Sequence, residues 1–201
     1  RDDLDMLAAL ERKVLWLASW MIHNANHLRE NDDGLKVGGH QASSASLATI
    51  MTALYFDVLR PQDRVAVKPH ASPIFHAIQY LLDNQSRERL EAFRGYKGAQ
   101  SYPSRTKDVD DVDFSTGSVG LGVAATGFAS LVQDYVRAKG WGGAWPKGRL
   151  IALMGDAEID EGVRRLLLDA LRQHFKPEFL NRIDDVIFFH ALSLNAIRQI
   201  I

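Results

Sequence analysis

The stretch Arg149-Leu-Ile-Ala-Leu-Met-Gly-Asp-Ala-Glu-Ile-Asp-Glu-Gly162 joins a buried strand to a cluster of carboxylates. Leu150 to Met154 form a short apolar run, the pattern of a strand buried on both faces, and Gly155-Asp156 ends it. In a parallel α/β sheet, ligands bind at the carboxyl ends of strands, and N–H groups at the next helix start attract anions. The stretch therefore predicts a metal ligand at Asp156 and a phosphate contact at the Ala157 N–H. An acidic helix start without any ligand gives the same pattern.

Length and composition indicate one main domain in an ordinary soluble chain. The 201 residues are enough for a sizeable core. A net charge of -1, without a run of Lys and Arg, gives no electrostatic case for nucleic acid or an anionic membrane. The absence of cysteine excludes disulfides, thiolate metal sites and a cysteine nucleophile. No apolar run reaches about 20 residues and the first residues are acidic, so we expect a cytoplasmic chain with no membrane span and no signal peptide.

Helix and strand patterns alternate before the opening stretch. Apolar residues recur at helical spacing over residues 4–25, and another helix ends before Pro61. Residues 64–67 form a short strand candidate, after which Ser72 is expected to cap a helix that begins at Pro73. A further short helix is expected over residues 86–94. These patterns predict an α/β fold with a largely parallel sheet flanked by helices.

Two pairs of histidines are candidate site residues, one because of its spacing and the other because of its position at helix entrances. His23 and His27 lie four residues apart on the first helix, the spacing of a metal pair, but no third ligand is near them in sequence. We interpret them as part of a polar helix face. His40 and His70 each stand at a helix entrance, where a side chain can face a ligand cavity. For His40, capping its own turn is the alternative.

Two glycine-rich or polar segments precede the opening stretch. Residues 95–120 have little apolar periodicity and contain Ser101-Tyr-Pro-Ser-Arg105; a loop this long is usually functional or disordered. Its end runs into a helix rich in small residues. A tight helix contact or a close ligand approach explains such a cluster, whose spacing does not match a dinucleotide-binding fingerprint.

Four stretches stand in an order that resembles the thiamine-diphosphate enzymes of the transketolase type, most closely the homodimeric decarboxylating component of pyruvate dehydrogenase. They are Gly38-Gly-His-Gln-Ala-Ser43, Lys68-Pro-His-Ala-Ser72, Ser115-Thr-Gly-Ser-Val-Gly-Leu-Gly122 and Gly155-Asp-Ala-Glu-Ile-Asp-Glu161. With the Ser101-Tyr-Pro103 loop, the resemblance spans about residues 4–162. An ordered set is far more specific than any one member.

The resemblance implies the half of a thiamine-diphosphate-binding fold that grips the diphosphate through Mg²⁺. It implies that Asp156 binds Mg²⁺ and that the Ala157 backbone and the His70 side chain contact the diphosphate. A hard cation with carboxylate and phosphate ligands suits this chemistry. Thiamine diphosphate and Mg²⁺ are therefore the expected cofactors.

The resemblance also implies residues on the substrate side of the cofactor. His40 is expected to line the substrate channel, and His40 and His70 are the expected catalytic residues because imidazoles shuttle protons or orient a carbonyl oxygen. The aminopyrimidine is expected beside the turn formed by Gly120, Leu121 and Gly122.

The chain departs from the family pattern in three places. Ala157 stands where the family commonly has glycine, although its N–H is retained. The asparagine that supplies another Mg²⁺ ligand is missing, since the corresponding region reads Arg182-Ile-Asp-Asp-Val-Ile-Phe-Phe-His190. We expect this chain to lack the domain that grips the aminopyrimidine in the family. We therefore expect a truncated enzyme that is inactive alone, with a second copy or a complementary pyrimidine-binding domain as partner.

Beyond Gly162 the sequence resembles another family, the second ATPase module of Clp-type AAA+ disaggregases. The resemblance rests on Gln173-His-Phe-Lys-Pro-Glu-Phe-Leu-Asn-Arg-Ile-Asp184 and the apolar segment after it. No Gly-x-x-x-x-Gly-Lys-Ser/Thr loop occurs, so ATP hydrolysis is not expected. We divide the chain into an incomplete diphosphate-binding domain, 1–162, and a foreign tail, 163–201, joined as a chimera of two gene fragments near Val163.

Three functions remain open at this point, of which the third, nucleotide-dependent association with an AAA+ partner, rests on the tail alone. The first is a fragment of a thiamine-diphosphate-dependent enzyme of 2-oxo acid decarboxylation or ketol transfer. The second is a non-catalytic binding or assembly module that keeps the dimerising helices. Cofactor binding discriminates between these two.

Overall fold

The computed structural model describes residues 2–30, 34, 36–117, 120–144 and 146–155. The chain divides into two compact units, residues 1–152 and 153–201, and the predicted tail lies outside the described residues. The elements of the first unit are α1 (Asp2–His23), η1 (Asn24–Leu28), α2 (Gln41–Ala45), α3 (Ala48–Ala53), η2 (Leu54–Val58), β1 (Arg64–Ala66), η3 (Pro69–Ala71), α4 (Ser72–Leu81), α5 (Arg87–Glu91), α6 (Leu121–Ala138) and β2 (Leu150–Ala152).

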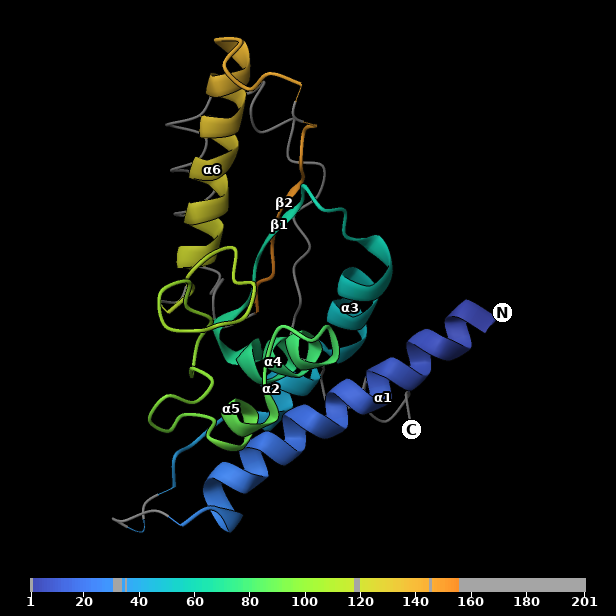
Figure 1. Cartoon of the computed structure of the whole chain (residues 1–201), viewed down its shortest axis with the longest axis vertical. Coiled ribbons are helices and arrows are strands. Elements are labelled where there is room, and N and C mark those ends of the chain that lie inside the picture. The colour runs from blue at the N-terminus through green and yellow to red at the C-terminus, as the bar shows by residue number, and fades with distance from the viewer. Residues whose placement is uncertain (1, 31–33, 35, 118–119, 145, 156–201) are drawn as a thin grey trace. The chain divides into compact units, whose positions relative to one another are not determined.

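Strands β1 and β2 form a parallel pair, which confirms the predicted α/β character of the chain. Arg64 lies opposite Leu150 and Ala66 opposite Ala152, and α6 packs along both strands (Figure 1). Each strand has three residues, fewer than predicted. The expectation that β2 is buried on both faces is wrong: its residues are half-buried. In the described part of the chain the sheet consists of these two strands.

Asp63 ties the two strands together where they begin. Its buried carboxylate accepts hydrogen bonds from the Arg149 backbone N at 2.7 Å and from Arg149 Nε at 3.0 Å. The Arg60 backbone N donates a third bond at 3.0 Å. Burial by itself raises the pKa of Asp63, but these bonds outweigh burial and lower the pKa to about 2. The parallel register therefore depends on a charge-assisted contact.

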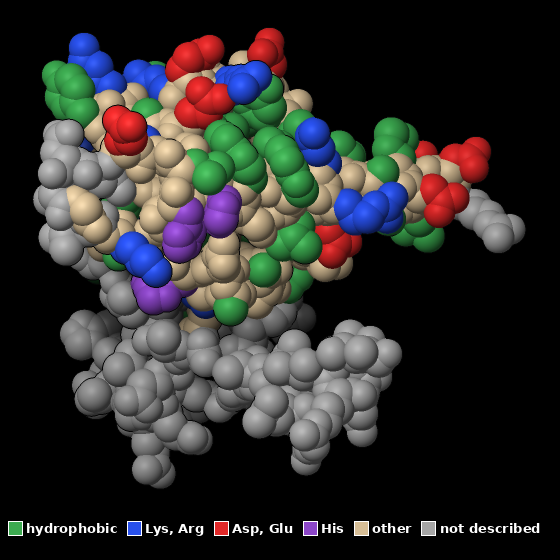
Figure 2. Space-filling view, turned by 90° about the horizontal axis from the view of Figure 1, so that it is seen from below, with side chains coloured by type: hydrophobic (Ala, Val, Ile, Leu, Met, Phe, Trp, Pro, Cys, Tyr) green, Lys and Arg blue, Asp and Glu red, His purple; other side chains and the backbone are tan. Residues whose placement is uncertain are grey.

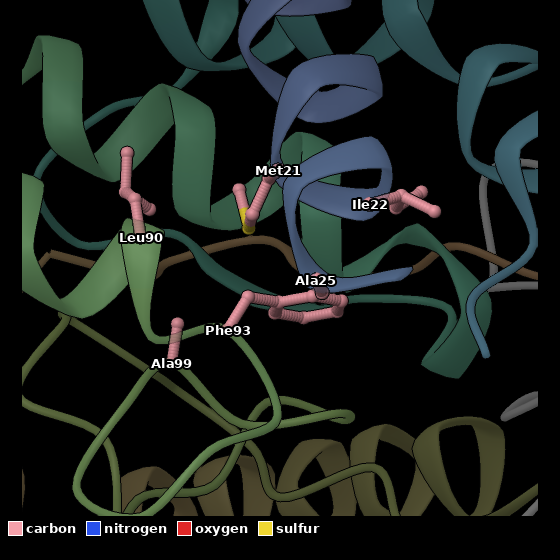
Figure 3. Close-up of a cluster of buried hydrophobic side chains, with 6 residues drawn as sticks. All are labelled: Met21, Ile22, Ala25, Leu90, Phe93 and Ala99. Atoms are coloured by element: carbon pink, nitrogen blue, oxygen red, sulfur yellow. The ribbon is translucent and has the colours of Figure 1, made fainter. Parts of the chain in front are cut away.

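The hydrophobic core lies where α1 packs against α4. One face of α1 buries Val14, Leu17, Ala18, Met21 and Ile22, and all residues of α4 from Ser72 to Gln79 are buried. The end of α1 and the segment after α5 also meet in a cluster of Met21, Ile22, Ala25, Leu90, Phe93 and Ala99 (Figure 3). Among the described residues, no helix is long and apolar enough to span a membrane.

Two local predictions are corrected by the structure. The helix expected before Pro61 is broken by a turn at Ser46 and Leu47 into α2 and α3, and ends in the π-helical turn η2. Ser72 does not cap α4. It is the first helical residue, and its hydroxyl donates instead to the Ser101 carbonyl at 2.6 Å.

Candidate functional site

His40 and His70 meet, although they come from different elements. His40 precedes α2 and His70 lies in η3, directly after β1, and α2 packs against η3. The centroids of the two rings are 4.5 Å apart. His40 is exposed and forms no side-chain cap for α2, so the capping alternative is wrong. The structure therefore brings together the two residues predicted as catalytic.

The backbone before His40 is fixed by side chains that sequence reasoning missed. Gly38 and Gly39 both have positive φ, 81° and 128°, which a residue with a Cβ rarely adopts. The Asn26 amide holds Gly38 from both sides: it accepts from the Gly38 N at 2.8 Å and donates to the Gly38 O at 3.0 Å. Arg94 donates to the Val37 carbonyl at 2.8 Å. Neither contact has a local sequence signal, because both partners are distant along the chain.

His70 is kept toward its neutral form by its surroundings. Burial lowers its pKa first, and the positive charges of His40, Lys68 and Arg94 lower the pKa further. A neutral imidazole can donate from one ring nitrogen and accept at the other. The Tyr102 ring lies 6.2 Å from the His70 ring. Figure 2 shows histidines near Lys or Arg side chains on one face of the molecule.

The turn at Gly120, Leu121 and Gly122 begins α6 beside the end of β1. Gly120 has φ 79° and no side chain caps the helix. A Cβ on Gly122 would lie 3.2 Å from the Ala66 Cβ, at the carboxyl end of β1, so the predicted tight contact is confirmed at Gly122; a Cβ on Gly127 of the same helix would meet no atom within 4 Å. The Thr116 hydroxyl is buried, and among the described residues it has no hydrogen-bond partner.

Asp156 and Ala157, the predicted Mg²⁺ ligand and phosphate contact, lie outside the described residues. The described part of the site nevertheless fits an anionic cofactor. After β1 the chain offers the half-buried His70 imidazole with the Lys68 charge beside it, and the start of α6, which no side chain caps, packs against Ala66 at the end of the same strand. Such a set at the carboxyl end of a parallel strand suits a phosphate group.

A second group of ligand-type atoms has a structural role. Atoms of His76, Asp108 and Asp110 lie within 4.8 Å of one another. Each carboxylate and both His76 nitrogens already take part in protein hydrogen bonds: Asp108 accepts from the backbone N of Gln100 at 3.0 Å and of Ser104 at 2.8 Å. We therefore do not assign a metal to this group. Sequence reasoning missed it, because His76 sits within an otherwise apolar helix.

His23 and His27 form a ring pair with centroids 4.9 Å apart. They line a pocket with Asn26, Lys36 and Gly38. In the described part of the chain, no carboxylate joins them in a metal-like cluster. The interpretation of this pair as a polar surface is retained.

Comparison with known proteins finds two separate similarities. The chain is 30% identical over 163 residues to the pyruvate dehydrogenase E1 component of Escherichia coli K12, which covers 76% of this chain and 18% of that protein. It is 50% identical over 52 residues to chaperone protein ClpB 1 of Nostoc, which covers 26% of this chain and 6% of the chaperone. A ClpB of Agrobacterium fabrum is 48% identical over 48 residues, 24% of this chain and 6% of that protein.

No family model matches the chain. The chain spans less than a fifth of the E1 component and about a twentieth of each ClpB. The similarities therefore establish resemblance to segments of two kinds of protein.

Proposed function

We propose that residues 4–162 are the diphosphate-binding part of a thiamine-diphosphate-dependent enzyme of the pyruvate dehydrogenase or transketolase type. The proposal rests on the contact between the His40 and His70 rings and on the Gly120 to Gly122 turn, which packs against the carboxyl end of β1. The similarity to the E1 component over 76% of the chain supports the same assignment. Tail residues 163–201 are proposed to derive from a ClpB-like segment.

Each predicted site residue is proposed to contact a different part of the cofactor. Neutral His70 offers a ring N–H to a diphosphate oxygen, and the Ala157 N–H offers a second donor. Asp156 contributes a carboxylate to Mg²⁺, which prefers oxygen ligands and phosphate. Gly120, Leu121 and Gly122 face the aminopyrimidine. A bound thiamine diphosphate supplies the carbanion chemistry.

His40 is proposed to act on the substrate. Its exposed ring beside His70 is free to hold or move a proton at a substrate carbonyl oxygen. The reaction class is 2-oxo acid decarboxylation or ketol transfer. Because the family cleft lies between two domains, the chain alone is proposed to have no turnover, and a second copy or a complementary pyrimidine-binding domain to complete it.

A second candidate function, a non-catalytic assembly module, is favoured by helix α6. Of its residues, only Thr126 is buried. Leu121, Phe128, Val132 and Tyr135 are exposed along it, and Trp141 follows at 70% exposure. An apolar row of this kind marks an interaction surface.

Calorimetric titration with thiamine diphosphate and Mg²⁺ separates the two functions. The cofactor-binding proposal expects saturable heat that requires Mg²⁺. A chain that forms dimers in sedimentation experiments but shows no cofactor heat would support the assembly module and contradict the cofactor site. Pyruvate turnover by the isolated chain would contradict its proposed inactivity.

A further inference from the structure

His76 is a buried histidine with a hydrogen-bond acceptor at each ring nitrogen. Its side chain in α4 is fully buried. Nε2 lies 3.0 Å from the Gln100 carbonyl oxygen, and Nδ1 lies 2.6 Å from Asp110 Oδ2. A carbonyl oxygen can only accept, so Nε2 must carry a proton.

The contact with Asp110 decides whether the imidazole carries a second proton. The Gln85 side-chain nitrogen donates to Asp110 Oδ1. The orientation of that amide is fixed, because its oxygen accepts from the Ser86 backbone N at 3.0 Å. With Oδ1 occupied as an acceptor, the 2.6 Å contact at Oδ2 holds one proton. On an ionised Asp110 that proton belongs to Nδ1, which makes His76 a donor at both ring nitrogens.

We propose that His76 is a buried imidazolium that latches residues 100–113 onto helix α4 and so sets Tyr102 against His70. Ser72 lies one turn before His76 on the same helix face and donates to the Ser101 carbonyl at 2.6 Å. Two side chains of α4 therefore hold two consecutive carbonyls of the loop. Tyr102 comes next in sequence.

The latch continues through the acidic residues of the loop. Asp108 accepts from the backbone N of Gln100 and of Ser104, so it closes the segment on either side of Tyr102. The titratable groups that face His76 are Asp110 and Asp108, and its ring neighbours Phe75 and Phe93 do not titrate. The groups that form the latch are not themselves proposed cofactor ligands, so its hydrogen bonds stand whether or not the chain binds thiamine diphosphate.

The direction in which the latch depends on pH follows from the negative charges beside His76. Burial lowers the pKa of His76, but the hydrogen bond and charge of Asp110 and the charge of Asp108 outweigh burial and raise the pKa above its ordinary value. The latch is fully present below the ordinary pKa, about 6.5. It is lost as the pH rises through the raised pKa of the folded chain.

Limited trypsin digestion of the whole chain tests the latch, because Arg105 and Lys107 are exposed within the loop. Cleavage at Lys139, in an exposed turn outside the loop, is the internal reference for the activity of trypsin. We expect the ratio of Arg105 to Lys139 cleavage to rise about tenfold per pH unit between the ordinary and raised pKa of His76. His76→Gln should raise the ratio at acidic pH, and His27→Gln should not.

Nuclear magnetic resonance of the His76 ring nitrogens provides a readout on the unmodified chain, should the His76→Gln chain fail to fold. We expect two protonated nitrogens at about pH 6, below the ordinary histidine pKa. A single protonated nitrogen there would overturn the proposal. So would a cleavage ratio that stays constant while the His76 resonances report deprotonation, or a folded His76→Gln chain whose ratio equals that of the wild type.

Discussion

The imidazole rings of His40 and His70 lie with their centroids 4.5 Å apart at the entrances of two helices. Asn26 and Arg94 hold the backbone before His40, while β1 and η3 carry His70. Two rings at this distance do not readily both carry a positive charge. The proximity of His40 therefore contributes to the lowered pKa of His70.

The first prediction concerns the titration of His70. Burial, followed by the charges of His40, Lys68 and Arg94, lowers its pKa, so we expect it to titrate below about 6.5. Replacing Lys68→Met removes one charge and should move the pKa of His70 upward. Proton chemical shifts measured against pH provide the test, with the exposed His27 as the reference ring. A His70 that titrates above 6.5, or does not respond to Lys68→Met, would contradict this electrostatic account.

The second prediction concerns the link between β1 and β2. Asp63→Asn removes the charge that holds Arg149, and we expect a loss of about 1–3 kcal/mol in the free energy of unfolding. Because the pKa of Asp63 is lowered to about 2, this contribution is present above about pH 4 and disappears as the pH falls toward 2. Urea unfolding at several pH values measures it. Asp57→Asn, at an exposed position, is the control, and an equal loss there would refute the link.

The third prediction compares two glycines of α6. A Cβ at Gly127 meets no atom within 4 Å, so Gly127→Ala should stabilise the helix by about 0.5–1 kcal/mol. A Cβ at Gly122 approaches Ala66 and Thr116 to 3.2 and 3.3 Å, and this crowding should offset the same gain. Thermal unfolding of both variants is the measurement. Equal stabilisation by both would show that Gly122 is not a packing constraint.

Local patterns predicted the α/β class, the parallel strands and the helical entrances of His40 and His70, because each depends on neighbouring residues. These local patterns could not predict which residues hold the site in place. Asn26 reaches Gly38, Arg94 reaches Val37, and these contacts join segments that only the folded chain brings together.

Long-range contacts also explain why the role of the buried histidine of α4 was missed and why its serine was wrongly predicted as a cap. Ser72 before a proline has the pattern of a helix cap, yet a long-range partner, Ser101, takes its hydroxyl. His76 lies among apolar residues of α4, and no neighbouring residue in the sequence predicts its contact with Asp110, 34 residues further along the chain. The predicted division at residue 162 and the roles of Asp156 and Ala157 remain predictions, since those residues lie outside the described ranges.

The most direct test of the proposed cofactor site is calorimetric titration of thiamine diphosphate into the whole chain, with and without Mg²⁺. We expect saturable binding that requires Mg²⁺ and weakens at least about tenfold, or about 1.4 kcal/mol, in Asp156→Ala. Asp160→Ala, in the same acidic stretch, should bind as the wild type does. Absence of binding with Mg²⁺ present, or binding that neither Mg²⁺ nor Asp156→Ala alters, would contradict the account.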